Sequence, residues 1–273
     1  MSKPGSEAAS FVASSRAMCK VPSRRRDGAI TVTLRFLPIL SLLAATAVPL
    51  GAARAQAPLQ APATERAPDT MAARVLACAS CHGAEGEGTT DVYFPRLAGK
   101  PAGYLYNQLV AFRDGRRKYP PMNYLLDFLP DEYLKKIAEH FASLRPPFPP
   151  PAVPTVSKEI LARGEAIATS GDPQRGVPPC AGCHGTSFGG MEPAIPGLLG
   201  LRASYISAQL GGWRYGTRTA AAPDCMQVVA GLLTEDDVKA VAAFLSSRPA
   251  PADPSFAKRG SLPMPLSCGS EPN

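Results

Sequence analysis

A six-residue motif occurs twice in this chain of 273 residues, and the repetition restricts the possible folds more than any other feature. Residues 78–83 read Cys-Ala-Ser-Cys-His-Gly, and residues 180–185 read Cys-Ala-Gly-Cys-His-Gly. Further matches follow each motif in the same order, 101 positions apart: Pro95, Leu97, Gly99, Tyr104, Gln108, Leu109, Arg113, Gly115 and Arg117 match Pro196, Leu198, Gly200, Tyr205, Gln209, Leu210, Arg214, Gly216 and Arg218. Such an ordered duplication predicts two homologous halves.

The spacing of apolar residues predicts helices in both halves. The final helix of each half has an apolar face at i, i+3, i+4 and i+7: Leu134, Ile137, Ala138 and Phe141, then Val238, Val241, Ala242 and Leu245. Thr234 is placed to cap the second of these helices. An earlier helix carries Leu105, Leu109 and Phe112, matched by Ile206, Leu210 and Trp213. We interpret the aromatic pair as core, with electron gating as the alternative. No strand pattern is found, so the predicted fold class is all-α.

A proline-rich segment separates the halves. Six of the nine residues 146–154 are proline, which favours a stiff, extended linker over a ligand for another domain. The predicted organisation is a signal peptide at 1–55, a flexible segment at 56–70, domain 1 at 71–145, a Pro-rich linker at 146–157, domain 2 at 158–248 and a Pro-rich C-terminal tail at 249–273.

The first 55 residues predict export. Three arginines at 24–26 precede an apolar run at 36–50, and Ala53-Arg54-Ala55 forms a cleavage site before Gln56. The run is shorter than the roughly 20 residues of a membrane span, although an uncleaved anchor is the alternative. Translation could also begin at Met18. The expected location is the periplasm, and membrane association is expected only through partners or an uncleaved signal.

The positive charge of the chain is concentrated in this leader. The formal net charge is +7, but residues 1–55 hold eight basic and two acidic residues, which leaves +1 for the remainder. A nearly neutral mature chain has no basic surface to attract a phosphate backbone. Nucleic acid is therefore not an expected partner.

The pattern Cys-x-x-Cys-His is the attachment signature of c-type haem. Cysteines three apart lie on one side of a helical turn, where two thiols can bond the two vinyl groups while the histidine points at the iron. The expected cofactor is haem c, two groups, covalently bound through Cys78, Cys81, Cys180 and Cys183. The alternatives are weaker. A thioredoxin-like pair would need a βαβ context, which this chain does not offer. A structural zinc site would have to join two Cys-x-x-Cys pairs that lie in separate halves about a hundred residues apart, and simple disulfides would leave the repeated histidines unexplained.

His82 and His184 are the predicted first axial ligands, and the repeat selects Met122 and Met226 as the second pair. These two methionines are 104 positions apart, like the final helices. Prolines close before both suggest stiff, extended backbone at the ligand. His140 is interpreted as a partly exposed structural residue, and Met71, Met191 and Met264 have no counterparts in the other half.

Two cysteines remain after haem attachment and removal of Cys19 with the leader. Cys225 and Cys268 both lie in the second half of an exported chain, where disulfides form readily. We predict a bond between them that ties the tail beside Met226. The alternative is two unrelated thiols, because sequence does not show how closely their Cα atoms approach.

The chain resembles the two-haem class I cytochromes c, in particular the cytochrome c4 family. The resemblance covers about residues 71–248: the haem motif, a Pro-x-Leu-x-Gly segment, a Tyr-x-x-x-Gln-Leu helix ending in Arg-x-Gly, a methionine and a final helix, each present twice. It implies a periplasmic carrier that passes electrons to a terminal oxidase or from a dehydrogenase, with two cytochrome c folds facing each other. The long linker, Cys225 and the tail depart from the family pattern.

Three functions remain open on sequence. The leading prediction is a non-enzymatic carrier that transfers single electrons between redox partners through two His/Met-ligated haems. The second is a cytochrome subunit of a periplasmic dehydrogenase. The third is a haem enzyme of the thiosulfate-oxidising or peroxidase type, which would need an open or displaceable iron ligand; a plausible methionine in each half counts against it.

Overall fold

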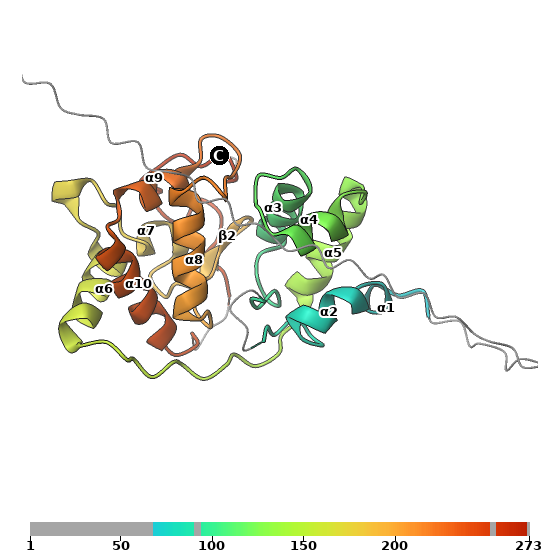
Figure 1. The fold of residues 1–273 in the computed structure, drawn as a ribbon, viewed down its shortest axis with the longest axis horizontal. Helices are drawn as coiled ribbons and strands as arrows, with labels where there is room; N and C mark the ends of the chain where they lie inside the picture. Colours follow the sequence, from blue (N-terminus) through green and yellow to red (C-terminus); the bar gives the residue numbers. More distant parts are fainter. Residues whose placement is uncertain (1–67, 90–93, 252–254, 272–273) are drawn as a thin grey trace, which may run out of the picture. The chain divides into compact units, whose positions relative to one another are not determined.

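The computed structural model describes residues 68–89, 94–251 and 255–271 (Figure 1). The predicted signal peptide, its cleavage site and most of the segment at 56–70 lie outside the described residues. Within the described ranges, no helix combines the length and hydropathy that crossing a membrane requires.

The first half contains five helices among its described residues: α1 Met71–Arg74, α2 Leu76–His82, α3 Ala102–Arg113, α4 Pro120–Leu126 and α5 Asp131–Ser143. The predicted apolar face of α5 is confirmed, because its buried residues are Leu134, Ile137, Ala138 and Phe141. They join Leu105 and Phe112 of α3 in one hydrophobic cluster. Phe112 is therefore a core residue, as interpreted from the sequence.

The second half contains α6 Lys158–Ser170, the 3-10 turn η1 Pro173–Arg175, α7 Ala181–His184, α8 Ala203–Arg214, α9 Cys225–Leu232 and α10 Glu235–Ser247. The Thr234 cap is confirmed: its hydroxyl accepts from the backbone N–H of Asp237, whose carboxylate accepts in return from Thr234 N–H. Ile206 and Leu210 of α8 pack with Val241 and Leu245 of α10 in a second hydrophobic cluster.

Helix α6 has no counterpart of equal length among the described residues of the first half, where α1 has only four residues. Ser157 caps α6, and Ile167 and Ala168 face the second cluster. Gly164 lies so close to α10 that a Cβ there would come within 2.1 Å of the carbonyl oxygen of Ala240. The absence of a side chain at this position lets the two helices touch.

The structure adds a short hairpin to the predicted helices. Strands β1 Gly190–Met191 and β2 Ile195–Pro196 pair antiparallel, with Gly190 opposite Pro196 and Met191 opposite Ile195. Two residues per strand are too few to produce the alternation by which strands are recognised in sequence. Over the described residues the fold is mainly α-helical, and this hairpin shows that the expectation of no strands was wrong.

Residues 144–157 contain no helix or strand. The carbonyl groups of Pro146 and Pro147 accept hydrogen bonds from the buried guanidinium of Arg96, which also lies 4.4 Å from the ring centre of Phe148. Further along, Ala152 N–H donates to the carbonyl of Ser246, 2.9 Å away. This proline-rich segment is thus attached to both halves.

The predicted Cys225–Cys268 disulfide is confirmed, with the two Cα atoms 5.1 Å apart. Cys268 is buried, and the tail before it pairs with the hairpin through Ala257, which exchanges backbone hydrogen bonds with Gly190 and Glu192. The sequence separation of 43 residues corresponds to a stabilisation of about 3–4 kcal/mol in the chain-entropy model.

Candidate functional site

The first motif lies at the end of a helix that presents its histidine to the interior. Cys78, Cys81 and His82 all belong to α2, and both cysteines are free and half-buried. The imidazole of His82 is 7% exposed, and its Nδ1 lies 2.9 Å from the carbonyl oxygen of Pro95. A carbonyl can only accept, so Nδ1 carries the proton and Nε2 keeps a free lone pair.

The second motif repeats this arrangement. Cys180 directly precedes α7, and Cys183 and His184 lie within that helix. His184 is buried, and its Nδ1 is 2.7 Å from the carbonyl oxygen of Pro196, so its Nε2 is also left unprotonated. An imidazole held by a hydrogen bond through one nitrogen, with the other free, is the usual form of a histidine that binds a metal.

The glycine after each histidine ends the motif helix. Gly83 and Gly185 adopt φ values of 87° and 83°, a region that glycine enters without the steric cost borne by other residues. The chain therefore turns away immediately after His82 and His184. Each turn leads the chain towards Pro95 or Pro196, the residue that holds the imidazole.

Burial sets the protonation of the motif side chains. Burial lowers the pKa of both His82 and His184, against an opposing effect of the proline carbonyl groups, so both rings are neutral at pH 7. Burial raises the pKa of the Cys78 thiol, and that of Cys180 to about 11. The motif therefore offers neutral imidazoles, the form that binds metal, beside protonated thiols.

The two proline carbonyls were not identified as functional from the sequence. Pro95 and Pro196 were matched as part of the repeat. Their main-chain carbonyl groups accept hydrogen bonds from histidines 13 and 12 residues earlier in the chain, and such a bond leaves no pattern in the sequence. The repeat was the available signal, since both prolines head the same Pro-x-Leu-x-Gly segment.

Met122 and Met226 each lie in the first turn of a short helix, α4 and α9. Met122 packs against the same hydrophobic cluster as Cys78, and Met226 against the same cluster as Cys180. The extended backbone expected around them was wrong. Proline is tolerated at the start of a helix because the N–H it lacks would have no partner there, so Pro120 and Pro121 begin α4 rather than prevent it.

The other candidate ligands lie elsewhere. Met191 is 2% exposed in strand β1 and packs beside the tail. His140 is half-buried near the end of α5, with its ring centre 5.3 Å from that of Phe141. The half-buried position of His140 agrees with the partly exposed structural residue expected from the sequence.

A symmetric network of matched residues joins the two halves. Arg117 donates to Gln108 of its own half at 2.9 Å and to Gln209 of the other at 2.7 Å; Arg218 donates to Gln209 at 2.8 Å and to Gln108 at 2.7 Å. Arg117 also donates to the hydroxyl of Tyr205. Because each partner has its counterpart 101 positions away, the contact has the form of a two-fold interface between equivalent surfaces.

Backbone and aromatic contacts complete the network. Lys118 N–H donates to the carbonyl of Thr217 at 3.0 Å, and Thr219 N–H to that of Arg116 at 2.7 Å. The guanidinium of Arg117 lies 4.5 Å from the ring centre of Phe112, and that of Arg218 lies 3.7 Å from that of Trp213. Phe112 and Trp213 therefore make cation–π contacts with the two arginines in addition to packing in the hydrophobic clusters.

The network is strongly cationic. Arg117, Arg218 and Lys100 are buried, and none takes part in an ion pair among the described residues. Lys100 donates instead to the carbonyl of Gly197, 3.1 Å away in the other half. Although burial opposes ionisation, the charges of Arg218, Arg117 and Lys100 lower the pKa of Tyr104 to about 8. Buried cations with neutral acceptors only are suited to receive an anionic group.

These cations are near both histidines. The charge of Arg117 contributes to the lowered pKa of His82, and the charge of Lys100 contributes to that of His184, in each case after the larger effect of burial. A geometric contact supports this on one side: Lys100 donates to the carbonyl of Gly197, the residue after Pro196, whose own carbonyl holds His184. The second candidate site therefore borders the interface between the halves.

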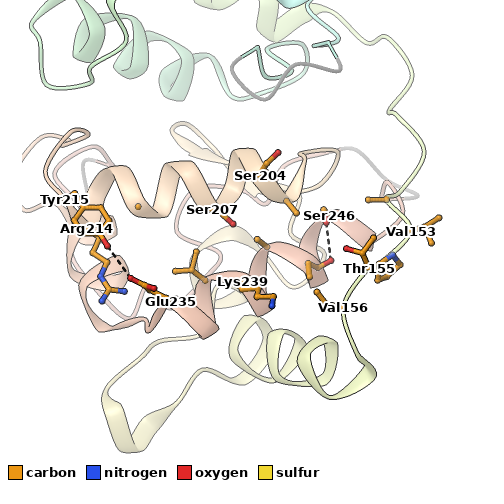
Figure 2. Close-up of a pocket in the computed structure, with 17 residues that line it drawn as sticks. Val153, Thr155, Val156, Ser204, Ser207, Arg214, Tyr215, Glu235, Lys239 and Ser246 are labelled. Atoms are coloured by element: carbon orange, nitrogen blue, oxygen red, sulfur yellow. Dashed lines mark hydrogen bonds between the residues drawn. The ribbon is translucent and has the colours of Figure 1, made fainter.

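A hollow of about 620 Å³ lies between residues 152–156 and helices α8 and α10 (Figure 2). At one end Tyr215 donates to the carboxylate of Glu235, 3.5 Å away. None of the motif cysteines, motif histidines or paired methionines lines this hollow. It is separate from the candidate site.

Comparison with known proteins places these features in context. The cytochrome c family model matches residues 71–139. The chain is 36% identical over 172 residues to a thiosulfate dehydrogenase electron acceptor from Thiomonas intermedia, covering 63% of this chain and 78% of the relative. It is 35% identical over 175 residues to a cytochrome c4 from Pseudomonas aeruginosa, covering 63% and 84%.

Two solved structures are similar. Reduced recombinant cytochrome c4 from Pseudomonas stutzeri superposes with a TM-score of 0.56 at 30% identity, covering 65% of this chain and 96% of that one. A thiosulfate dehydrogenase from Marichromatium purpuratum superposes with a TM-score of 0.57 at 35% identity, covering 63% of this chain. This chain spans only 36% of that second structure.

Proposed function

The chain belongs to the family of di-haem cytochromes c4, and from that premise we propose that it carries single electrons between periplasmic redox partners through two His/Met-ligated haems. Members of this family are electron-transfer proteins with covalently bound haem c. The observation that carries the proposal is the repeated pairing of two free cysteines with a buried histidine whose Nδ1 is bound by a proline carbonyl.

The residues of both motifs fit haem c. Cys78 and Cys81, and likewise Cys180 and Cys183, would bond the two vinyl groups, while Nε2 of the adjacent histidine would bind the iron. When bound, haem supplies an iron that changes oxidation state by one electron. The chain holds the imidazole in one tautomer and orientation before and after that change.

Met122 and Met226 would occupy the opposite axial positions. Each packs on the core of its own motif, in agreement with this role. A thioether favours reduced iron and so raises the reduction potential. If His and Met both bound the iron, no coordination site would be left for a substrate, which favours a carrier over an enzyme.

The cationic network between the halves would receive the acidic side groups of the two haems. Three buried cations lie near the two histidines: Arg117, Arg218 and Lys100. The carboxylates of haem would supply the anionic partners that these cations do not have among the described residues. This placement would bring the haems to the interface and allow electrons to pass from one half to the other.

The domain organisation fits the same function. We propose cytochrome c domains at 71–145 and 158–248, joined by the linker at 146–157 and followed by the tail at 249–273; each half has its own hydrophobic cluster, as separate domains require. The leader at 1–55 would direct the chain to the periplasm and then be removed.

A dehydrogenase is the partner that the relatives favour. The similarity to thiosulfate dehydrogenase electron acceptors supports a second, more specific proposal, in which this chain takes electrons from a periplasmic dehydrogenase of that kind. A terminal oxidase would then be one possible acceptor. The two proposals share the haem chemistry and differ only in the donor.

Four measurements test the function: denatured mass, redox titration, stopped-flow mixing with the proposed donor, and reactivity with carbon monoxide or peroxide. The denatured mature protein should exceed its polypeptide mass by two haem groups, and a redox titration should take up two electrons per chain. Stopped-flow mixing with a purified thiosulfate dehydrogenase should reduce both haems if the second proposal holds. Rapid binding of carbon monoxide by the reduced protein, or turnover of peroxide, would contradict the carrier role.

A further inference from the structure

The loops that lead to the two methionines differ in length. Met122 follows Arg117 by five positions, whereas Met226 follows the matched Arg218 by eight. The longer loop, residues 219–224, includes three consecutive alanines. A longer loop of small residues has more conformations to lose, so the loop by itself holds Met226 less firmly than its counterpart holds Met122.

The first half restrains its methionine locally. Pro120 and Pro121 occupy the first turn of α4 and limit the backbone before Met122. Asn123, the next residue, donates from Nδ2 to the carbonyls of Arg117 and Phe112 and accepts from Tyr119 N–H at 2.8 Å. Met122 therefore lies between two fixed neighbours.

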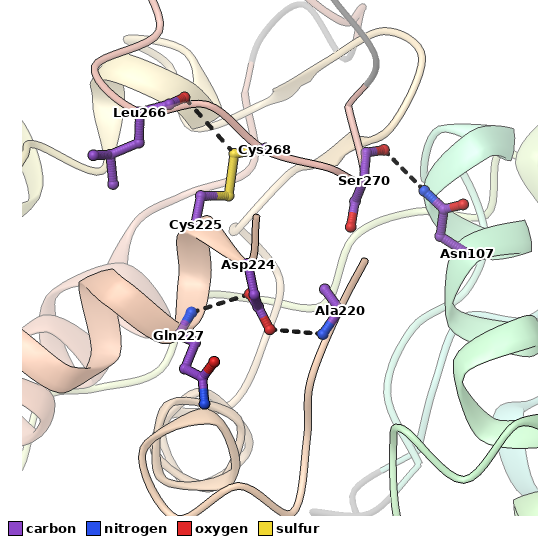
Figure 3. Close-up of a disulfide and its surroundings, with 8 residues drawn as sticks. All are labelled: Asn107, Ala220, Asp224, Cys225, Gln227, Leu266, Cys268 and Ser270. Atoms are coloured by element: carbon purple, nitrogen blue, oxygen red, sulfur yellow. Dashed lines mark hydrogen bonds between the residues drawn. A yellow bond between two sulfur atoms is a disulfide. The ribbon is translucent and has the colours of Figure 1, made fainter. Parts of the chain in front are cut away.

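The second half has one proline, Pro223, before the N-cap of α9 and none within the helix, and it has no hydrogen-bonded asparagine after its methionine. Asp224 and Cys225 stand where the first half has prolines, and Gln227, in place of Asn123, is exposed. Asp224 caps α9: its carboxylate accepts from Gln227 N–H at 3.1 Å and from Ala220 N–H at 2.6 Å (Figure 3). The covalent restraint at this turn is the disulfide from Cys225 to Cys268.

The tail is itself held around the disulfide. Gly269 N–H donates to the carbonyl of Pro223 at 2.9 Å, and a Cβ at Gly269 would come within 2.1 Å of the carbonyl oxygen of Ala222. Ser270 accepts from the Asn107 side chain on α3 at 3.0 Å. The buried carboxylate of Glu271 accepts from Ala194 N–H at 3.0 Å. The disulfide therefore connects α9 to an anchored segment and not to a loose end.

We propose that the Cys225–Cys268 disulfide is a positioning device for Met226, so that the methionine–iron bond of the second half depends on the C-terminal tail while that of the first half does not. The inference rests on the proposed His/Met ligation. It assigns to Cys225, and to residues 268–271, the role that Pro121 and Asn123 fill in the first half.

The test compares the two methionines within one molecule. In the ferrous protein each methionine bound to haem gives its own strongly shifted methyl resonance, so the wild type should show two. In Cys225→Ser/Cys268→Ser, the Met122 resonance should persist. The Met226 resonance should broaden or vanish, and the ferric methionine charge-transfer absorption at the red end of the visible spectrum should fall to about half.

A rescue variant separates positioning from general destabilisation. Cys225→Pro/Cys268→Ser removes the disulfide but places proline where the first half has Pro121. Cys225 is the first residue of α9 and Asp224 before it is extended, so proline is compatible there. The Met226 resonance should return in this variant. Haem content, measured on every sample, identifies any failure to incorporate the second haem.

Each outcome decides the proposal. Two unchanged resonances in the double serine variant would overturn it, and so would loss of both resonances, because the effect would then not be specific to one half. If the double serine variant fails to hold its second haem, the proline variant decides: a Met226 resonance supports positioning and its absence contradicts it. Absence of both resonances from the wild type would instead refute the His/Met ligation itself.

Discussion

In the first half, α4 begins with two prolines and is fastened by Asn123 to the end of α3, all within about 12 residues of chain. In the second half, α9 begins at Cys225, is capped by Asp224, and is joined by a disulfide to Cys268, 43 residues away. Both arrangements present a methionine in the first turn of a helix. The comparison shows that equivalent positions can be held by local or by long-range restraints.

The same contrast appears in the electrostatics of the final helices. Asp237 of α10, in the second half, is fully buried. Its carboxylate accepts hydrogen bonds from Arg163 Nε at 2.8 Å and from Arg175 Nη1 at 2.7 Å. In the first half, the final helix α5 instead pairs through Asp131 with Arg113, and this aspartate side chain is 54% exposed. The second half therefore depends more on contacts between distant segments.

Removing one haem should have the largest effect and tests whether the halves are independent. Cys180→Ala/Cys183→Ala should leave a first half with a normal haem, because it has its own hydrophobic cluster. The denatured mass should fall by one haem, and the titration should take up one electron in place of two. Cys78→Ala/Cys81→Ala is the matched control. Loss of both haems in either variant would show that the halves fold together.

Replacing the methionines one at a time should come next in size. Met122→Ala and Met226→Ala should each remove about half of the methionine charge-transfer absorption and lower the potential of one haem, because the thioether stabilises reduced iron. Spectroelectrochemistry measures both quantities. A spectrum unchanged in both variants would contradict the assignment of these ligands.

Asp237→Asn should destabilise the second half at neutral pH. Burial opposes ionisation, but hydrogen bonds from Arg175 and Thr234 hold the pKa of Asp237 well below its usual range. The expected loss is about 2–3 kcal/mol, reduced from the value for a fully buried pair because both arginines are partly exposed. Urea unfolding at pH 7 measures it.

The pH dependence of this variant has a definite sign. A lowered folded-state pKa gives stability that is present above the unfolded value of about 4 and is lost as the pH falls through the folded value. The difference between wild type and Asp237→Asn should therefore shrink on acidification below pH ~4. Asp131→Asn, which breaks the exposed pair in the first half, should leave the unfolding curve unchanged. A difference that grows in acid would contradict this account.

The smallest expected effect is in the local restraint of the first half. Asn123→Ala removes the hydrogen bonds that fix α4 to α3, a loss of about 1–2 kcal/mol. On heating, the Met122 resonance should be lost at a temperature about 5–10 °C lower than in the wild type, while the temperature at which the Met226 resonance is lost does not change. Gln227→Ala, at the matched exposed position, is the control and should have no effect on either signal.

Short-range spacing determined much of this protein from the sequence alone. The haem motifs, the apolar faces of α5 and α10 and the Thr234 cap depend on residues within one or two turns of each other, and all of these helices formed where predicted. The disulfide partners followed from a count of cysteines. Helix α4 did not follow, because consecutive prolines fit an extended segment and a helix start equally well.

Only the tertiary structure decided how these parts are held. The carbonyl groups of Pro95 and Pro196 select one imidazole tautomer, and Arg117 and Arg218 meet across the interface without a carboxylate. The tail reaches α9, Ala194 and α3 through Cys268 and its neighbours. Such contacts join residues from twelve to more than a hundred positions apart, and they depend on how the chain closes on itself, which no local periodicity encodes.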